Sequence, residues 1–322
     1  MNEKLNIQDI TDSSARSQGK FVDPDRTLDG EVRASVDPRR LKTLWINTGS
    51  LCNLTCENCY IESSPTNDRL VYITADEVQQ LIDEIVAEKF GTEEIAFTGG
   101  EPFLNPDMVA IIELCLRGGF KTLILTNGMK TLLRERDKLE RLRAAFPGLL
   151  RLRISLDHYL EETHALERGK RSWKPAIESL QWLSGSDIDF AVAGRTMWEE
   201  DEASMRTGYG DMFARENISL DANNPEELVL FPEMDDSVDV PEITTACWGI
   251  LKVDPADIMC ASSRMVVKHK GDDHLSVQAC TLLPYDQRFN LGTSLKQSWQ
   301  SVKLNHPHCA KFCVLGGGSC SS

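Results

Sequence analysis

Three cysteines lie close together early in the chain, and their spacing is the most informative chemical feature of the sequence. Cys52, Cys56 and Cys59 follow a short apolar run and are separated from one another by three and two residues. Three thiolates on one loop suit a cubane [4Fe-4S] cluster, because such clusters need deprotonated sulfur ligands that converge on one point. The fourth iron then has no protein ligand and stays open for chemistry.

Two other interpretations of these cysteines remain open. Zinc also binds thiolates, but a structural zinc site needs four nitrogen or sulfur ligands, usually as two closely spaced pairs, and a fourth ligand here must come from far along the chain. The second interpretation is three free thiols that pack as small apolar groups. Polar residues between the cysteines argue against this interpretation: Asn53, Thr55, Glu57 and Asn58.

A glycine turn follows a second apolar run, residues 94–97. It consists of Gly99, Gly100 and Glu101, and Pro102 comes next. Glycines allow a backbone to approach a ligand closely, and Glu101 adds an acceptor for an ammonium group. By itself such a turn is also an ordinary end to a strand, but after a loop with three cysteines it favours ligand binding.

The two motifs together resemble those of the radical S-adenosylmethionine (radical SAM) enzymes. Tyr60 supplies the aromatic residue that often follows the third cysteine in that family, and Gly99, Gly100 and Glu101 look like its Gly-Gly-Glu motif. In such enzymes the backbone of that turn receives the amino group of the cofactor's methionine. The resemblance implies that the open iron binds S-adenosylmethionine. It also implies reductive cleavage of that cofactor to a 5′-deoxyadenosyl radical, which abstracts a substrate hydrogen.

This resemblance implies an enzyme that oxidatively modifies a peptide, a protein or a small molecule. It implies a reducing electron donor of the flavodoxin or ferredoxin type. Two other classes stay open on the residues alone: a non-catalytic iron–sulfur protein that transfers electrons, and a binding module stabilised by zinc.

The elements that must position these motifs can also be predicted. Apolar or β-branched runs, mostly separated by segments of helical character, predict parallel strands with crossover helices in an α/β fold. The predicted strands cover residues 43–47, 94–98, 122–126, 151–156, 189–194 and 227–231. Six such units suggest an open (β/α)6 partial barrel, which is the fold that this family uses.

The clearest helix is predicted to start at Thr74. Thr74 and Glu77 have the spacing of a capping box, and apolar residues then recur at helical intervals. Further helices are predicted over residues 106–116, 132–145 and 174–183.

Polar residues at strand ends are candidates for binding the cofactor, because ligands of parallel β/α folds bind at the carboxyl ends of strands. Asn127 follows the third strand, and Ser155 and Asp157 flank the end of the fourth. Many family members place a polar group there against the ribose or the methionine carboxylate. Arg195, at the end of the fifth strand, suits that carboxylate as a bidentate donor. The alternative for all four is a turn or a solvated rim.

Six of the ten cysteines lie beyond residue 240. The first forty residues are polar and charged rather than an apolar signal segment, and no run of eighteen apolar residues could span a membrane. We therefore expect a cytoplasmic protein that contacts no membrane and keeps its thiols reduced, so clustered cysteines favour metal binding.

The region beyond residue 240 looks like the SPASM or Twitch extension of some radical SAM enzymes, which carries auxiliary iron–sulfur clusters. Its spacings depart from the full SPASM pattern, so the resemblance implies one auxiliary cluster rather than two. The candidate ligands exceed four by one: Cys260, Cys280, Cys309, Cys313 and Cys320. Cys247 is a further spare cysteine, and a zinc site made of the same thiolates is the alternative.

Charge and length limit the partners and the domains. The formal net charge is −15, which disfavours a nucleic-acid substrate because phosphate contacts need clustered Lys and Arg. An acidic surface favours a neutral or basic substrate. We expect three parts: a flexible or loosely docked extension over residues 1–40, the catalytic core over residues 41–235, and the cysteine-rich region over residues 236–322.

Overall fold

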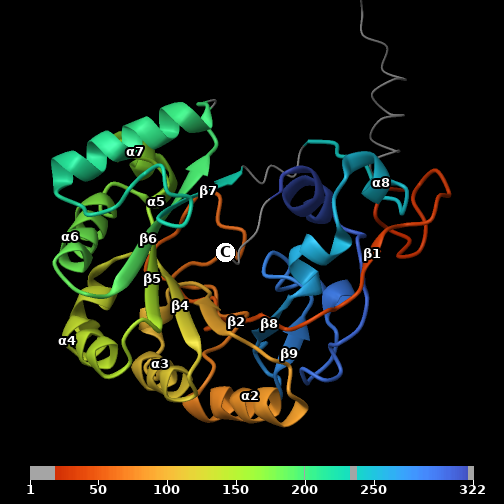
Figure 1. Cartoon of the computed structure of the whole chain (residues 1–322), viewed down its shortest axis with the longest axis horizontal. Coiled ribbons are helices and arrows are strands. Elements are labelled where there is room, and N and C mark those ends of the chain that lie inside the picture. Colours follow the sequence, from red (N-terminus) through yellow and green to blue (C-terminus); the bar gives the residue numbers. More distant parts are fainter. Residues whose placement is uncertain (1–18, 199, 233–237, 318–322) are drawn as a thin grey trace, which may run out of the picture. The chain divides into compact units, whose positions relative to one another are not determined.

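Parallel strands with crossover helices build the larger part of the computed structural model (Figure 1). The structure describes residues 19–198, 200–232 and 238–317. The chain divides into two compact units. Unit 2 comprises Arg40–Glu233 and Ser263–Trp299, and unit 1 comprises the described parts of Met1–Arg39, Met234–Ser262 and Gln300–Ser321.

Unit 2 contains an eight-stranded sheet with the order β7-β6-β5-β4-β3-β2-β8-β9. The strands are β2(Thr43–Asn47), β3(Glu94–Thr98), β4(Lys121–Thr126), β5(Leu150–Ser155), β6(Asp189–Thr196), β7(Leu228–Pro232), β8(Ser263–Val267) and β9(Ser276–Gln278). All neighbouring pairs from β7 to β8 are parallel, and β9 is antiparallel to β8. The six predicted strands are thus confirmed, as is the α/β class, and their arrangement is consistent with a partial barrel.

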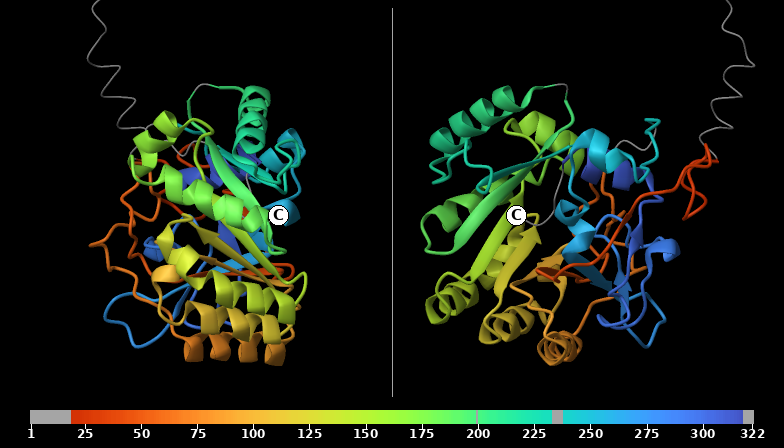
Figure 2. Two further views of the ribbon diagram at one scale, coloured as in Figure 1. Left: turned by 90° about the vertical axis from the view of Figure 1, so that its left-hand side faces the viewer. Right: turned by 45° about the vertical axis from the view of Figure 1, so that its right-hand side comes forward.

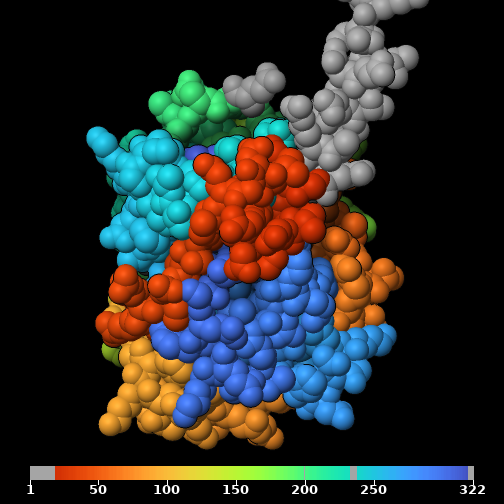
Figure 3. Space-filling model, turned by 90° about the vertical axis from the view of Figure 1, so that its right-hand side faces the viewer, coloured from red at the N-terminus to blue at the C-terminus, as the bar shows by residue number. Residues whose placement is uncertain are grey.

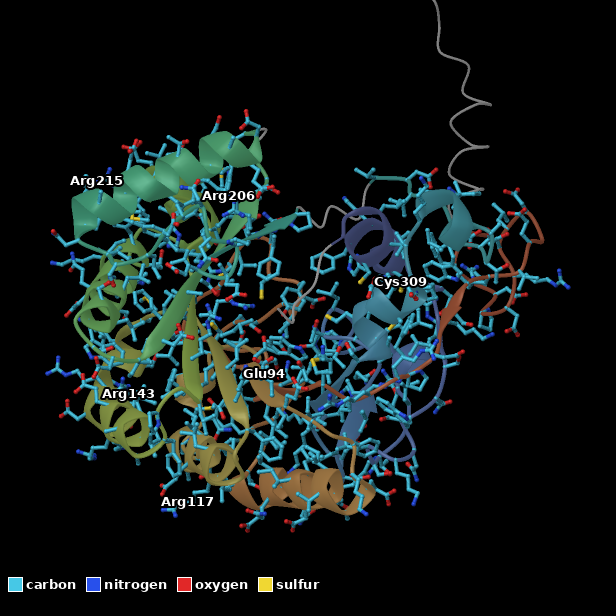
Figure 4. The ribbon with its side chains drawn as sticks, viewed as in Figure 1. Glu94, Arg117, Arg143, Arg206, Arg215 and Cys309 are labelled. Atoms are coloured by element: carbon cyan, nitrogen blue, oxygen red, sulfur yellow. The ribbon has the colours of Figure 1, made fainter. Side chains whose placement is uncertain are left out.

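The helices of unit 2 cover one face of the sheet, and Figure 2 shows this layering from two further directions. They are α2(Ala75–Glu88), α3(Met108–Arg117), α4(Lys130–Ala145), α5(Glu161–Arg168), α6(Trp173–Ser184) and α7(Glu202–Glu216), with short turns η1(Pro102–Leu104) and η4(Gln287–Phe289). The core between the layers is formed by alternate strand residues such as Ile95 and Phe97 together with helix residues such as Ile112. Arg117 and Arg215 point away from it into solvent (Figure 4).

The predicted capping box of α2 is present. The Thr74 hydroxyl oxygen accepts a hydrogen bond from the Glu77 backbone N–H at 3.3 Å, and the Glu77 carboxylate accepts one from the Thr74 N–H at 2.8 Å. Two of the unpaired donors at the helix start are thereby satisfied, so the local sequence determines where this helix begins.

The compact units divide the chain differently from the expected domains. Residues 263–299, expected in the cysteine-rich region, belong to unit 2, where β8 pairs in parallel with β2. The whole of β8 is buried. Its backbone groups therefore need partners, and the open edge of β2 supplies them. The extent of the catalytic core stays a prediction.

Unit 1 contains a two-stranded sheet of β1(Ser35–Val36) and β10(Val302–Lys303), with the short helical segments α8(Cys247–Leu251), η2(Pro255–Asp257), η3(Met259–Ala261) and the π-helical η5(Cys309–Leu315). Of the two forms expected for residues 1–40, flexible or loosely docked, residues 19–39 take the docked one within unit 1. The Ala34 N–H donates to the Ile243 carbonyl at 2.8 Å, and Figure 3 shows this segment in red beside the cyan one that follows residue 237.

A buried ion pair explains this order. Arg33 donates to Glu242 at 2.5 Å, and the Glu242 carboxylate also accepts the N–H groups of Phe21 and Leu28, both at 2.6 Å. Neither side chain of the pair is appreciably exposed. Among the described residues, no helix is both long and apolar enough to cross a membrane.

Replacing Arg33 with Met should destabilise unit 1 by about 3–5 kcal/mol, because the Glu242 carboxylate then stays buried without its counter-charge. Denaturant unfolding, with hydrogen exchange followed over residues 19–39, measures this loss. Arg117→Met is the matched control, since its partner Glu113 is exposed and the pair contributes at most about 0.5 kcal/mol. Equal effects of the two substitutions would contradict the assignment.

Candidate active site

The three-cysteine loop follows β2 at the carboxyl edge of the sheet. The Cys52 N–H donates to the Ser64 carbonyl at 3.0 Å, and Leu51 forms a parallel bridge with Ser64. The far side of the loop is held by Tyr285, whose hydroxyl donates to the Ile61 carbonyl at 2.9 Å. The loop therefore has a defined start and end at the edge where the sequence predicted it.

Burial differs among the three thiols. Cys52 is buried, and Cys56 and Cys59 are half-buried. Burial raises the pKa of Cys52 to about 12. Burial also raises the pKa of Cys56, although the positive charge of Arg168 partly offsets this rise. Without bound metal these two thiols thus keep their protons at neutral pH, so that cluster binding must release protons.

The glycine turn packs directly on the backbone of the cysteine loop. The Gly100 N–H donates to the Gly49 carbonyl at 2.8 Å, and the Glu101 N–H donates to the Leu51 carbonyl at 3.1 Å. A Cβ atom on Gly100 would lie 2.0 Å from the Leu51 carbonyl oxygen, so no other residue fits there.

This packing leaves acceptors available. Among the described residues, no group donates a hydrogen bond to the carbonyl oxygens of Gly99 or Gly100. Because a backbone carbonyl is an obligatory acceptor, two such groups beside three thiols suit the ammonium of an amino acid.

The side chain of Glu101 is buried against the ends of two strands. It is 1% exposed, and its carboxyl group accepts from the Thr126 hydroxyl at 2.8 Å and from the backbone N–H groups of Asn127 at 2.9 Å and Phe103 at 3.1 Å. Glu101 thereby connects the ends of β3 and β4. Its expected role as an acceptor for an ammonium group stays a prediction.

Asp157, beyond the end of β5, is paired with an arginine that the sequence analysis missed. Arg168 donates to its two carboxylate oxygens at 2.6 and 3.0 Å. Burial alone would raise the pKa of Asp157, but the charge and hydrogen bonds of Arg168 outweigh burial and lower it. The pKa of Arg168 is raised despite its burial, because Asp157 and the thiols of Cys56 and Cys59 lie close.

The end of α5 also holds the cysteine loop. The Glu167 carbonyl accepts from the Glu57 N–H at 3.0 Å, and its carboxylate accepts from the Asn58 side-chain amide at 2.8 Å. Arg195 donates to the same carboxylate at 3.3 Å and to the Asn58 carbonyl at 3.4 Å. In the sequence, Glu167 and Arg168 could have been noticed only as two charged residues at the end of a helix that follows a strand end.

The other residues predicted to bind the cofactor differ in exposure and in their contacts. Ser155 ends β5 half-buried, and within the described part of the chain no protein group hydrogen-bonds its hydroxyl. Tyr60 is 41% exposed. Asn127 contacts Cys52 through its side chain, with 3.7 Å between Nδ2 and Sγ. The roles of these residues, and of Arg195, in binding a cofactor stay predictions.

A second group missed by the sequence analysis connects the loops after β5 and β6. His158 and Glu200 are 2.9 Å apart between Nε2 and Oε1, and the Tyr159 hydroxyl donates to the other Glu200 oxygen at 2.9 Å. His158 Nδ1 accepts the Leu160 N–H at 3.0 Å, so Nε2 carries the proton toward Glu200. The ring of Trp198 packs edge-on against His158.

The carboxyl-terminal cysteines are divided between the units. Cys247, Cys260, Cys309 and Cys313 lie in unit 1, Cys280 lies in unit 2, and Cys320 lies outside the described residues. Burial, with the neighbouring Cys260 thiol, raises the pKa of Cys309 to about 12; Cys309 is the first residue of η5 and is labelled in Figure 4. Cys115 is a core residue of α3. Among the described residues, no three His, Cys, Asp or Glu side chains are already grouped to hold a metal ion.

Comparison with known protein families identifies the larger unit. The model described as the Radical SAM superfamily matches residues 46–205. The chain contains a radical SAM domain. Members of this superfamily use a [4Fe-4S] cluster and S-adenosylmethionine, and the matched residues include all three cysteines of the loop and the glycine turn. The donor set fits these cofactors, because three thiols and two available carbonyls lie at neighbouring strand ends.

Two curated relatives and one solved structure illustrate the similarity. The antilisterial bacteriocin subtilosin biosynthesis protein AlbA of Bacillus subtilis is 33% identical over 153 residues, which cover 46% of this chain and 32% of AlbA. The AdoMet-dependent heme synthase of Methanosarcina barkeri is 32% identical over 145 residues, 44% of this chain and 38% of that protein. The matches thus span about a third of these relatives, 32% and 38% of their lengths.

The solved structure is Streptococcus suis SuiB bound to its precursor peptide SuiA. It aligns with a TM-score of 0.57 and 12% identity over 93% of this chain and 71% of SuiB. At this identity the likeness concerns the fold alone.

Arg168→Met should destabilise unit 2 more at high pH than at low pH. Asp157 would stay buried without its partner, so its folded-state pKa would rise above the unfolded value, and stability would fall as pH rises through that range. We expect a loss of about 3–5 kcal/mol near neutral pH, measured by denaturant unfolding, and a clearly smaller loss near about pH 4. The double variant with Asp157→Asn should recover much of the loss. A loss independent of pH would contradict this account.

Proposed function

We propose that this chain is a radical SAM enzyme in which Cys52, Cys56 and Cys59 hold the [4Fe-4S] cluster and the strand ends of unit 2 bind S-adenosylmethionine. One observation carries the proposal: the Gly99–Gly100 backbone is packed on the cysteine loop, so that thiols and available carbonyls share one edge of the sheet. When bound, the cluster and cofactor supply a radical that abstracts a substrate hydrogen.

The chain's own residues have separate tasks in this proposal. The carbonyls of Gly99 and Gly100 accept the methionine ammonium, and the Ser155 hydroxyl is available to the ribose or the carboxylate. Arg168 carries a positive charge and is held by Asp157, and it offsets the negative charge of the thiolates nearby. The glycine turn and Arg168 are held by hydrogen bonds before a ligand arrives, so this part of the site is preorganised.

We propose a peptide as the substrate. AlbA is named for bacteriocin biosynthesis, and SuiB has been solved with a precursor peptide, which supports this class. The net charge of −15 favours a peptide that is neutral or basic. A small molecule is the second candidate, because the relative from Methanosarcina barkeri is a heme synthase. The proposed electron donor is of the flavodoxin or ferredoxin type.

We also propose an auxiliary iron–sulfur cluster on cysteines beyond residue 240. The candidates remain Cys260, Cys280, Cys309, Cys313 and Cys320. The closeness of Cys260 and Cys309 within unit 1 supports their joint role. Such a cluster would accept the electron left on an oxidised substrate or anchor the substrate.

Cys56→Ala should abolish reductive cleavage of S-adenosylmethionine, because the remaining two thiols cannot hold an open-iron cluster. Chromatography of 5′-deoxyadenosine from anaerobic reactions measures cleavage, and Cys115→Ala is the control because Cys115 lies in the core of α3. Cleavage that survives Cys56→Ala would overturn the proposed site.

Replacing all three loop cysteines with alanine should lower the iron content from about eight to about four iron atoms per chain if an auxiliary cluster is present.

Co-expression with small peptides encoded beside the gene tests the substrate class. We expect one of them to lose two hydrogen atoms in mass spectrometry. The oxidation removes one abstracted hydrogen atom, one proton and one electron, and the proposed auxiliary cluster accepts that electron. The Cys56→Ala chain should leave every peptide unmodified. A wild-type protein that modifies a small molecule but none of these peptides would favour the second candidate.

A further inference from the structure

We propose that Asn127 is a positioning residue that raises the reduction potential of the cluster by donating a hydrogen bond from its side-chain amide to the sulfur of Cys52. The inference rests on the proposed function, in which Cys52 is a ligand. It gives Asn127 a task other than direct contact with S-adenosylmethionine.

The contact is buried and specific. Asn127 Nδ2 lies 3.7 Å from Cys52 Sγ and 2.7 Å from Asn53 Oδ1. Asn127 is 6% exposed, and so is Cys52. A hydrogen bond shielded from water in this way has more electrostatic effect than one at the surface.

The orientation of the amide is determined by its neighbours. Asn127 Oδ1 accepts the Met129 N–H at 3.1 Å, so that the opposite end, Nδ2, must face the sulfur. A flipped amide would bring two donors together at Met129 and two acceptors together at Asn53. The backbone N–H of Asn127 donates to Glu101 at 2.9 Å, which holds the residue in place. Glu101 of the glycine turn thus positions the donor to the cluster ligand.

Other donors to the loop sulfurs belong to the backbone. The Leu54 N–H approaches Cys52 Sγ at 3.4 Å, and the Ser63 N–H approaches Cys59 Sγ at 3.4 Å. In the described part of the chain, Asn127 makes the one side-chain hydrogen bond donated to these three sulfurs. It is therefore the donor that a substitution can remove.

The direction of the effect follows from charge. Reduction adds an electron to the cluster and its thiolates, and an N–H group directed at a ligand sulfur stabilises that added charge. Hydrogen bonds to the sulfurs are among the factors that determine cluster potentials. Loss of the Asn127 donor should therefore make the potential more negative and the reduced state harder to reach.

Asn127→Leu tests the proposal in the anaerobically reconstituted full chain. The cluster is titrated with a reductant and followed by the EPR signal that is absent from Cys56→Ala. At a fixed potential we expect the ratio of reduced to oxidised cluster to fall about three- to tenfold, where tenfold corresponds to 59 mV for one electron. Iron content should match that of the wild type.

Asn105→Leu is the matched control. Asn105 is buried to a similar degree, and its side-chain oxygen accepts the Asp107 N–H at 2.9 Å in the same local geometry. Its amide donates at 2.8 Å to the Ile73 carbonyl rather than to a sulfur. This variant should keep the wild-type potential.

The outcomes are distinguishable. Asn127→Leu with full iron content and an unchanged potential would overturn the inference, as would an equal shift in Asn105→Leu. If Asn127→Leu does not hold iron, Asn127→Asp decides, because it keeps the acceptor for Met129 but replaces the donor with a negative charge. It should shift the potential further negative, and an unchanged potential would overturn the inference. Full iron content with an unchanged EPR spectrum in Cys56→Ala would instead overturn the proposed cluster site.

Discussion

The contact between two backbones, Gly99–Gly100 on residues 49–51, is the constraint on which the site depends. Gly100 has no room for a Cβ atom beside the Leu51 carbonyl, and its N–H is paired with Gly49. The contact joins the loops after β2 and β3 without using side chains. The thiols and the glycine carbonyls can therefore lie at one edge of the sheet, because neither motif needs a side chain to reach the other.

Buried ionisable groups form the next layer around this contact. Glu101 connects β3 to β4, Asp157 and Arg168 connect β5 to α5, and Glu167 joins α5 to the cysteine loop. A buried polar or charged group is costly unless it is hydrogen-bonded, so each of these groups is held by partners from another segment. The loops at the strand ends are thereby connected to one another by side chains as well as by the glycine turn.

Unit 1 is held together by contacts between segments that lie far apart in the sequence. Its segments come from both ends of the chain and from the region after residue 237, and they are held together by the Arg33–Glu242 pair and the pairing of β1 with β10. No periodicity in residues 19–39 indicates this order, because the segment has hardly any regular secondary structure. Its stability comes from partners more than two hundred residues away.

By itself, the sequence determined the six parallel strands, the capped start of α2, the cysteine loop and the glycine turn, because each depends on local periodicity or on residue types a few positions apart. Only the tertiary structure decided that β8 joins β2, that Glu101 faces Thr126 and Asn127, and that Arg168 pairs with Asp157. The reason is physical. A strand edge or a buried charge must be satisfied by some partner, but the local sequence does not specify which of the available partners the fold brings within reach.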